Sequence, residues 1–303
     1  TFRQFTDGIT DTRVAMWILV SGNIMNIFGN WVLIYGHLGM EEMGLIGAGL
    51  STMISRILMA LVMMGIFFFS KKYKEYRKGW HQGQTNRRDF RQITVLGFPL
   101  ALQMGMETAA FSLSSLMVGW FGTTALAAHQ VMLTISQLGY MIYYGLAAAV
   151  AVRISNFMGQ RDYTAVRRTA TAGIHLVFFL AMLTSVPIFI FRHSMGALFT
   201  DNTEVISMVS MTIVPFMIYQ FGDGMQCNYA NAMRGIAVVK PLIWIAFIAF
   251  FIVSLPLGYL FGVVMNFQLL GIWYAFPFGL TTAGILYYVY YQKGLRRIEE
   301  SAK

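Results

Sequence analysis

Two acidic residues stand apart from the others because they lie in apolar surroundings. Of the 13 Asp and Glu residues, only Glu107 and Asp223 fall deep inside long apolar stretches. A carboxylate at membrane depth is unfavourable by about 3 kcal/mol even on lenient insertion scales, so it normally faces a cavity or a positive partner. The two residues therefore predict a site for a proton or metal cation, or else a structural ion pair with Arg56, the one basic residue deep inside such a stretch.

Helical spacing adds neutral oxygen atoms to this candidate site. Tyr219, Asp223 and Gln226 are separated by one helical turn each, so they share one face of a helix. Hydroxyl, amide and carboxylate oxygens are ligands that hard cations prefer. We therefore expect Na⁺ to bind at Glu107 and Asp223, with Tyr219 beside them.

A second polar face lies in the stretch 124–152. Gln137, Tyr140 and Tyr144 recur there at helical spacing, and the ring of Tyr140 could lie against a bound cation. We expect Gln137, Tyr144 and Gln226 to line a substrate cavity, although such residues also serve as hydrogen-bonding links between helices. A stripe of asparagines, Asn23, Asn26 and Asn30, is predicted to hold two helices together.

Composition indicates the elements that position these side chains. The chain has 303 residues, of which 57% are hydrophobic and 12% charged, whereas soluble domains have about 25% charged residues. This excludes a soluble enzyme. A transmembrane helix needs about 20 mostly apolar residues, and eight such stretches occur, at 14–35, 43–70, 95–121, 124–152, 164–191, 204–233, 241–262 and 269–291. The predicted fold is an all-α polytopic membrane helix bundle.

The basic residues predict the orientation. If both termini are cytoplasmic, every one of the 22 Lys and Arg residues except Arg56 and Arg192 lies in a cytoplasmic segment. Positive charge accumulates on the cytoplasmic side of membrane proteins, so this orientation is strongly favoured. The basic residues behind the net charge of +9 are then explained by membrane orientation and by attraction to the anionic lipids of the inner leaflet. We therefore expect no nucleic-acid partner.

Features of several other protein classes are missing from the sequence. The single cysteine, Cys227, excludes a disulfide scaffold. The chain contains no phosphate-binding glycine loop and no HExxH or GxSxG motif. We therefore expect no enzyme activity and no cofactor.

Two parts of the chain look like copies of one another. Trp17, Gly36 and Gly47 match Trp244, Gly262 and Gly271 in type and approximate spacing. An even number of predicted helices separates the copies, which is typical of transporters with two like-oriented halves. On this basis we expect the chain to hold two helices of a first half and six of a second, with four helices of the intact protein lying upstream.

Several motifs resemble the multidrug and toxic compound extrusion (MATE) family of transporters. They are Gly97-Phe98-Pro99 before Glu107, Leu126 to Val131, Arg153 with Gly159, Tyr219-Gln220 with Asp223 and Gln226, Arg234-Gly235, and, near the start, Asn23, Asn26, Asn30 and Gly44-x-x-Gly47-x-Gly49. The pair formed by Glu107 and Tyr219-x-x-x-Asp223 is similar to the NorM-like bacterial branch of the family. The acidic residue that the family carries on its first helix lies outside this chain.

The resemblance implies two six-helix lobes around a central cavity, with twelve transmembrane helices in all. Residues 1–70 would be the end of the first lobe, 71–94 a basic connecting loop, 95–292 the second lobe and 293–303 a basic tail. The expected activity is export of small amphipathic cationic drugs or dyes in antiport with Na⁺ or H⁺, by a monomer in the bacterial inner membrane. Glu107, Asp223, Tyr219 and Tyr140 would form the cation site. The alternatives are a flippase for lipid-linked oligosaccharides and a structural or receptor-like bundle.

Overall fold

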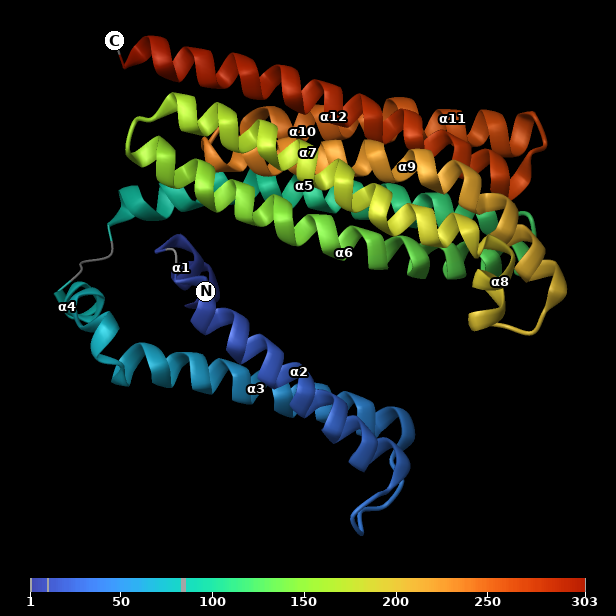
Figure 1. Cartoon of the computed structure of the whole chain (residues 1–303), viewed down its shortest axis with the longest axis horizontal. Helices are drawn as coiled ribbons and strands as arrows, with labels where there is room; N and C mark the ends of the chain where they lie inside the picture. The colour runs from blue at the N-terminus through green and yellow to red at the C-terminus, as the bar shows by residue number, and fades with distance from the viewer. Residues whose placement is uncertain (1, 10, 83–85, 303) are drawn as a thin grey trace. The chain divides into compact units, whose positions relative to one another are not determined.

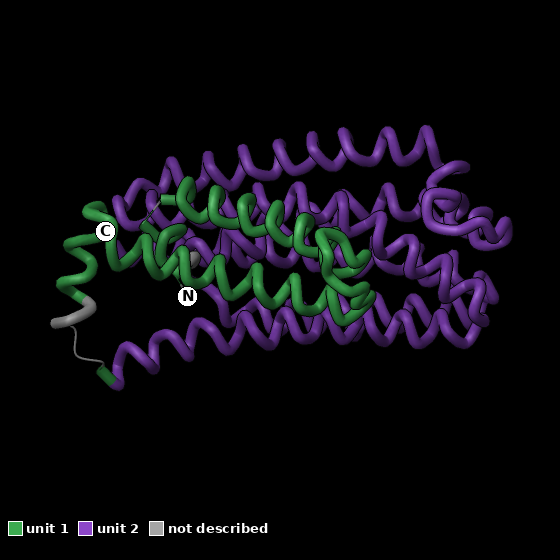
Figure 2. Tube along the Cα trace, turned by 90° about the horizontal axis from the view of Figure 1, so that it is seen from below, with its two compact units in different colours: residues 1–86 green, residues 87–303 purple. Residues whose placement is uncertain are grey.

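The computed structural model describes residues 2–9, 11–82 and 86–302. The chain forms two compact units, residues 1–86 and 87–303 (Figure 2). The first unit contains α1 (Phe2–Gly8), α2 (Thr12–Tyr35), α3 (Gly44–Phe69), the short 3₁₀ helix η1 (Lys71–Tyr73) and α4 (Lys74–Gln82).

The first unit is a long helical hairpin. Helix α2 ends at Gly36, whose φ of 68° is in the left-handed region that favours glycine. The return helix α3 passes so close to α2 that a Cβ on Gly47 would lie 2.4 Å from the carbonyl oxygen of Leu33. Asn26 Nδ2 donates to Ser51 Oγ at 3.2 Å, and Ser51 Oγ donates back to the Asn26 carbonyl at 3.0 Å. The asparagine stripe thus contributes to holding the two helices together.

A polar cluster closes the end of this hairpin where α2 begins. The hydroxyl of Tyr73 donates to Asp11 Oδ2 at 2.5 Å, and Lys72 Nζ lies 2.6 Å from the same oxygen. Asp11 directly precedes α2, and both partners belong to η1, which follows α3. The cluster therefore ties the start of one helix to the end of the next.

The second unit is a bundle of long helices (Figure 1). It contains α5 (Arg87–Gly119), α6 (Thr123–Gly159), α7 (Tyr163–Ile190), the short α8 (Arg192–Met195) and η2 (Gly196–Leu198), α9 (Thr203–Gly235), α10 (Lys240–Ala246), η3 (Phe247–Ser254), α11 (Leu255–Tyr259), η4 (Leu260–Val264) and α12 (Gln268–Ser301). Helix α9 packs against α6, α7 and α12. It is therefore the central helix, which suits it to carry buried functional side chains.

One span of this unit is not a regular α-helix. Between Lys240 and Val264, the segments η3 and η4 are π-helical, and Pro256 lies in α11 between them. Helix α12 approaches this span closely, since a Cβ on Gly271 would lie 2.5 Å from the backbone of Phe261. Here a glycine permits direct backbone packing between the two helices.

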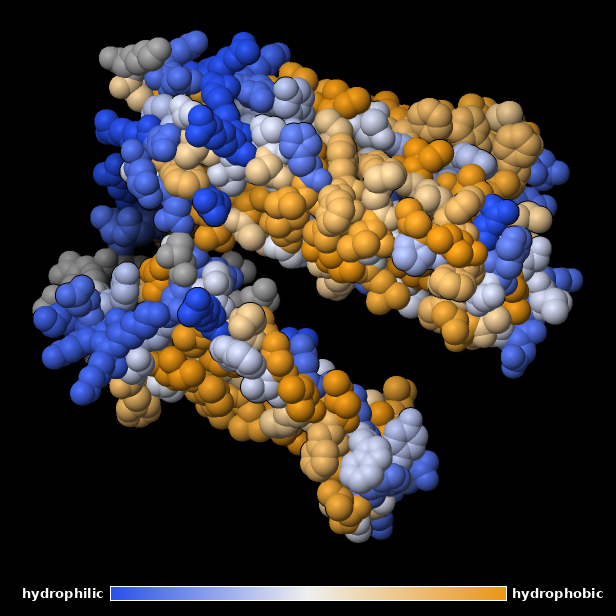
Figure 3. All heavy atoms as spheres, viewed as in Figure 1, coloured by the Kyte–Doolittle hydropathy of each residue, from blue (hydrophilic) through white to orange (hydrophobic). Residues whose placement is uncertain are grey.

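Seven helical segments of the described chain are long and apolar enough to cross a membrane: α2, α3, α6, α7, α9, the Lys240–Val264 span and α12. The eighth predicted span corresponds to α5, which has 33 residues. Polar residues such as Gln103 and Glu107 interrupt its apolar sequence. Large apolar side chains cover the middle of the helices and hydrophilic residues gather at their ends (Figure 3), as the bilayer interior requires.

The two basic segments that the sequence predicts, a connecting loop and a tail, are largely helical where the structure describes them. Residues 71–94, predicted as a connecting loop, contain η1, α4 and the first turns of α5. The predicted tail 293–303 continues α12 as far as Ser301. Both segments are rich in charge but also in good helix formers such as Lys, Arg, Gln and Glu, so their polarity does not prevent helix formation.

Candidate functional site

A cavity of about 340 Å³ opens in the second unit, between α5, α6 and α9. Its walls carry both isolated carboxyl groups. The lining residues are Met104, Glu107, Thr108 and Phe111 from α5, Leu133, Ser136, Gln137 and Tyr140 from α6, and Tyr219 and Asp223 from α9. Two consecutive helices, α5 and α6, and the later helix α9 thus bring five of the seven predicted site residues to one place.

Helical periodicity explains why each helix contributes the residues it does. On α5, Gln103, Glu107 and Phe111 follow one another at intervals of one turn, and on α9 Tyr219 and Asp223 do the same. Asp223 and Tyr219 are buried, whereas Glu107 is half-buried. The cavity is therefore bounded by one deep carboxyl group and one more accessible carboxyl group.

The Glu107 carboxyl group accepts hydrogen bonds from two amides. Gln226 Nε2 donates to Oε1 at 3.1 Å, and Gln103 Nε2 approaches Oε2 at 3.5 Å. Gln226 was predicted to line the cavity, but it is not among the lining residues; it is buried behind Glu107 and orients that side chain. Neutral donors hold the carboxyl group in place, and neither of them forms an ion pair with it.

Asp223 has a phenolic partner that the sequence did not single out. The hydroxyl of Tyr143, which is fully buried on α6, donates to Asp223 Oδ2. The ring of Tyr140 lies edge-on to Tyr143, with centroids 5.8 Å apart, and stacks on Tyr144 at 5.1 Å. Tyr144 is therefore a support for Tyr140 and not one of the lining residues.

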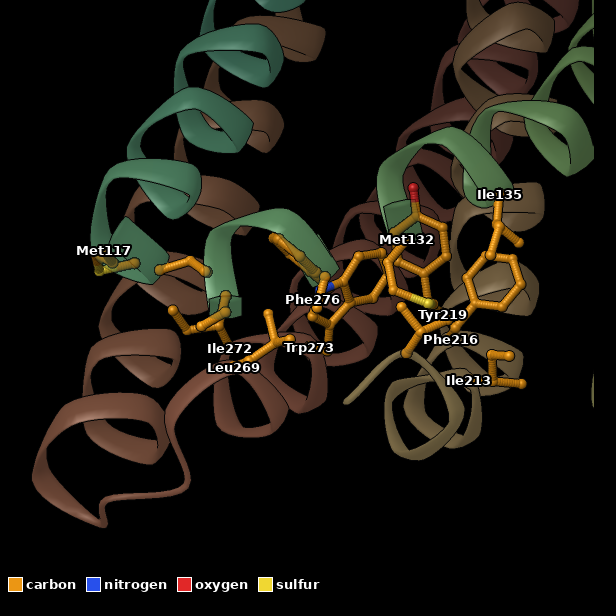
Figure 4. Packing of buried hydrophobic residues seen from close by; sticks show 14 of the residues in the cluster. Met117, Met132, Ile135, Ile213, Phe216, Tyr219, Leu269, Ile272, Trp273 and Phe276 are labelled. Atoms are coloured by element: carbon orange, nitrogen blue, oxygen red, sulfur yellow. The ribbon is translucent and has the colours of Figure 1, made fainter. Parts of the chain in front are cut away.

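An aromatic cluster fixes Tyr219 at the edge of the cavity (Figure 4). Its ring packs against Phe216, Trp273 and Phe276, with centroid separations of 5.8, 5.9 and 6.2 Å. The indole N–H of Trp273 donates to Nδ1 of the buried His129 at 3.1 Å. Because these rings already fix the side chain of Tyr219 beside Asp223, cation binding would not require Tyr219 to lose further conformational freedom.

Neither carboxyl group forms an ion pair with a described residue of this unit. Their hydrogen-bond partners are the amides of Gln103 and Gln226 and the phenols of Tyr143 and Tyr219. Arg56 belongs to the first unit and is exposed there, beside a pocket that Phe2, Ile18 and Met59 help to form. Two carboxyl groups without an ion pair and nearby hydroxyl oxygens are the kinds of ligand that a hard cation prefers. Glu107, Asp223, Tyr219 and Tyr140 are the residues that would hold it.

Several residues around the cavity were missed by the sequence reasoning. Gln103 had a usable signal, since it precedes Glu107 by one helical turn and is polar in an apolar stretch. Tyr143 had a weaker one, since it lies in a tyrosine-rich part of α6. Met104, Thr108 and Phe111 face the cavity only because of how α5 is rotated about its axis, which a single sequence does not reveal.

Comparison with known proteins agrees with this architecture. The family model described as MatE matches residues 99–260. The chain is 32% identical over 292 residues to the multidrug resistance protein NorM of Aliivibrio fischeri, a match that covers 94% of this chain and 63% of that protein. A probable multidrug resistance protein NorM of Photorhabdus laumondii is 30% identical, with 95% and 64% covered.

Solved structures show the same arrangement of helices. A structure described as the outward-facing conformation of a multidrug resistance MATE family transporter superimposes with a TM-score of 0.87, at 18% identity, over 99% of this chain and 66% of that chain. The present chain spans about 63–64% of the length of the NorM relatives. Because the family model covers more than half of its residues, this polytopic helical membrane protein belongs to the MatE family of transporters, with NorM-like relatives.

Proposed function

We propose that this chain is part of a multidrug efflux transporter that exports small amphipathic cationic drugs or dyes in exchange for Na⁺ or H⁺. The observation that carries the proposal is the cavity on which Glu107 and Asp223 lie together without a basic partner from their own unit. The names of the NorM relatives support drugs as the substrate class. The location would be the bacterial inner membrane.

The exchange mechanism follows from competition between positive charges. Two carboxyl groups in a poorly solvated cavity attract one or two cations well and a further one poorly. A cation that arrives from outside at Glu107 and Asp223 therefore weakens the hold on a cationic drug and favours its release. Between drug binding and drug release, movement of the two halves of the intact transporter would open the cavity first to one side of the membrane and then to the other.

The energy of exchange constrains the stoichiometry. A potential of about 100 mV provides roughly 2.3 kcal/mol per charge, and a tenfold ion gradient adds about 1.4 kcal/mol. Exchange of one monovalent ion for one monovalent drug moves no net charge, so it sustains only about a tenfold drug gradient. Strong export of cations needs two ions, for which the site offers two carboxyl groups.

Dye efflux from vesicles that contain the full-length gene product tests the proposal. E107Q and D223N each preserve side-chain volume and remove one negative charge, so both should abolish ion-dependent export while membrane insertion stays normal. R56Q is the control: transport by this variant should remain dependent on sodium or pH. Normal ion-driven efflux by both E107Q and D223N would contradict the proposal, and loss of correctly inserted protein in R56Q together with E107Q or D223N would favour the structural ion pair.

The charge of the cavity also argues against a flippase for lipid-linked oligosaccharides. Such a substrate carries phosphate groups, which require positive side chains. The described lining of the cavity contains two carboxyl groups and no lysine or arginine. Stimulation of transport by anionic lipid-linked substrates would be the result that favours this second function.

A further inference from the structure

A line of polar side chains leads from the cavity toward the end of α9. Gln103 is buried on α5 and uses both ends of its amide: Nε2 approaches Glu107 Oε2 at 3.5 Å, and Oε1 accepts from Arg234 Nη2 at 2.9 Å. Glu107 is thereby joined to a guanidinium group through a single amide. None of the sequence patterns discussed above assigned a role to Gln103.

Helix geometry explains how the arginine reaches this position. Arg234 lies in the last turn of α9, on the same face as Asp223 and about three turns further on, which is roughly 16 Å along the axis. Its side chain is half-buried and extends to α5. Close packing of α9 against α6 fixes its base, since a Cβ on Gly235 would lie 2.8 Å from the Ala151 carbonyl oxygen.

The guanidinium group has unused hydrogen-bonding capacity. Besides Gln103, its partner is Asn231 Oδ1 at 3.4 Å, a long contact, while the buried Nε has no partner within the described structure. Gln226 Oε1, on the other side of Glu107, is also buried without a partner there. Buried polar atoms are nearly always paired, so both ends of this network are suited to change partners when a cation binds or leaves.

The charge of Arg234 must act on Glu107. Arg234 forms no ion pair with a described residue of its unit, and Gln103, which accepts from Arg234 and approaches Glu107, holds the two charges at opposite ends of one amide, so that they interact through space. At a protein-like dielectric constant, a fixed positive charge about 8 Å from a carboxylate lowers the affinity of that carboxylate for a bound cation about tenfold or more.

We propose that Arg234 is a positioning residue whose positive charge, held near Glu107 by Gln103, lowers the affinity of Glu107 for the coupling cation. The affinity is thereby low enough for the cation to be released. This inference depends on the proposed function of Glu107. It assigns to Arg234 and Gln103 the task of setting the affinity for the ion, whereas Glu107 and Asp223 bind it.

The test measures sodium-dependent dye transport by the full-length protein in proteoliposomes. R234Q removes the charge and should lower the sodium concentration for half-maximal transport about tenfold, while the maximal rate falls because ion release becomes slow. R234K keeps the charge and should restore a near-normal half-maximal concentration. R153Q is the matched control, since Arg153 is exposed on α6 with its guanidinium over the Phe157 ring, and it should leave both quantities unchanged.

A second variant covers the case in which R234Q does not fold. Q103M keeps the side-chain length but breaks the link, and it should also lower the half-maximal sodium concentration, by a smaller factor. If the protein uses protons, the proton concentration for half-maximal transport is the quantity that should fall. A merely structural role would reduce the amount of folded protein or weaken ion binding, so unchanged or higher half-maximal concentrations in the folded variants overturn the inference.

The failure of this inference is distinguishable from the failure of the proposed function. If E107Q loses its ion dependence while R234Q and Q103M keep a normal half-maximal concentration, Glu107 binds the ion and Arg234 does not tune it. If E107Q keeps its ion dependence, the proposed function fails and the role of Arg234 fails with it.

Discussion

At the scale of single residues, the site depends on hydrogen bonds that orient charge without cancelling it. Glu107 is held by amides and Asp223 by the phenols of Tyr143 and Tyr219. A basic partner in either position would satisfy the carboxyl group permanently and leave little attraction for a visiting cation. The identity of these partners is therefore as informative as the presence of the carboxyl groups.

The phenol of Tyr143 gives a sharp prediction. Y143F removes the hydroxyl that donates to Asp223 while it preserves the ring, so Asp223 keeps only Tyr219 of its two phenolic partners and its charged form becomes less favourable in the buried site. We expect ion-dependent transport to fall about tenfold, with normal insertion, in vesicle efflux assays.

Tyr144 provides the control for this variant. Y144F also removes one phenolic hydroxyl from α6, but the described contact of Tyr144 at the site is ring stacking on Tyr140, which phenylalanine preserves. Transport by Y144F should be close to normal. Equal effects of Y143F and Y144F would mean that the hydrogen bond to Asp223 is not important for transport.

The sequence allowed the carboxyl groups to be found but not their immediate partners. Glu107 and Asp223 are conspicuous because each is isolated in an apolar stretch. Their meeting on one cavity, and the pairing of Asp223 with Tyr143, depend on the rotation and depth of α5, α6 and α9 relative to one another. Periodicity fixes which residues share a helix face, but not which face of another helix they meet.

At the scale of elements, the helix ends were more predictable than the interruptions. Gly36 marks a helix end in sequence and in structure. The basic segment around α4 was predicted as a loop because it is polar, although polar helix formers are compatible with a helix at the membrane surface. The π-helical segments η3 and η4 have no distinctive sequence signal, since they lie in a uniformly apolar stretch.

The cluster of Asp11, Lys72 and Tyr73 predicts a pH-dependent contribution to stability at the end of the first hairpin. The hydrogen bonds from Lys72 and then Tyr73 lower the pKa of Asp11 below its ordinary value of 3.8, and burial together with Asp11 raises the pKa of Tyr73 to about 12. A lowered carboxyl pKa stabilises the folded state above pH 3.8, and this contribution is lost as the pH falls through the lower folded value.

Thermal unfolding of the full-length protein in detergent tests this element. D11N should be less stable than the wild type at pH 7 by about 1 kcal/mol, a modest amount because Lys72 is well exposed to solvent. Below about pH 3.8 the difference should begin to shrink, because the carboxyl group of the unfolded wild type is then protonated, and it should vanish once the pH falls below the lowered pKa of the folded state. E75Q, a change in the exposed first turn of α4, should match the wild type at both pH values. A gap between D11N and the wild type that does not vary with pH would contradict the electrostatic explanation.

At the scale of the whole molecule, the distribution of charge determines which way the chain crosses the membrane. All but two of the 22 basic residues lie in segments that share one side if both termini are cytoplasmic. Among the described turns, Arg161 between α6 and α7 and Asp201 before α9 lie at opposite ends of α7 and are both exposed. The positive-inside rule therefore predicts that Arg161 faces the cytoplasm and Asp201 faces the outside.

Single cysteines at these two positions test the orientation in intact cells that produce the full-length protein. D201C should react with a membrane-impermeant maleimide added from outside, whereas R161C should react only after the cells are permeabilised. The native Cys227 is buried and should remain unlabelled, so the unmodified protein is the background control. The orientation also fixes the direction of the proposed exchange, because Arg234 lies at the same end of the bundle as Arg161. Labelling of R161C and not D201C in intact cells would place Arg234 at the outer surface, where it would promote ion loss to the outside and oppose efflux.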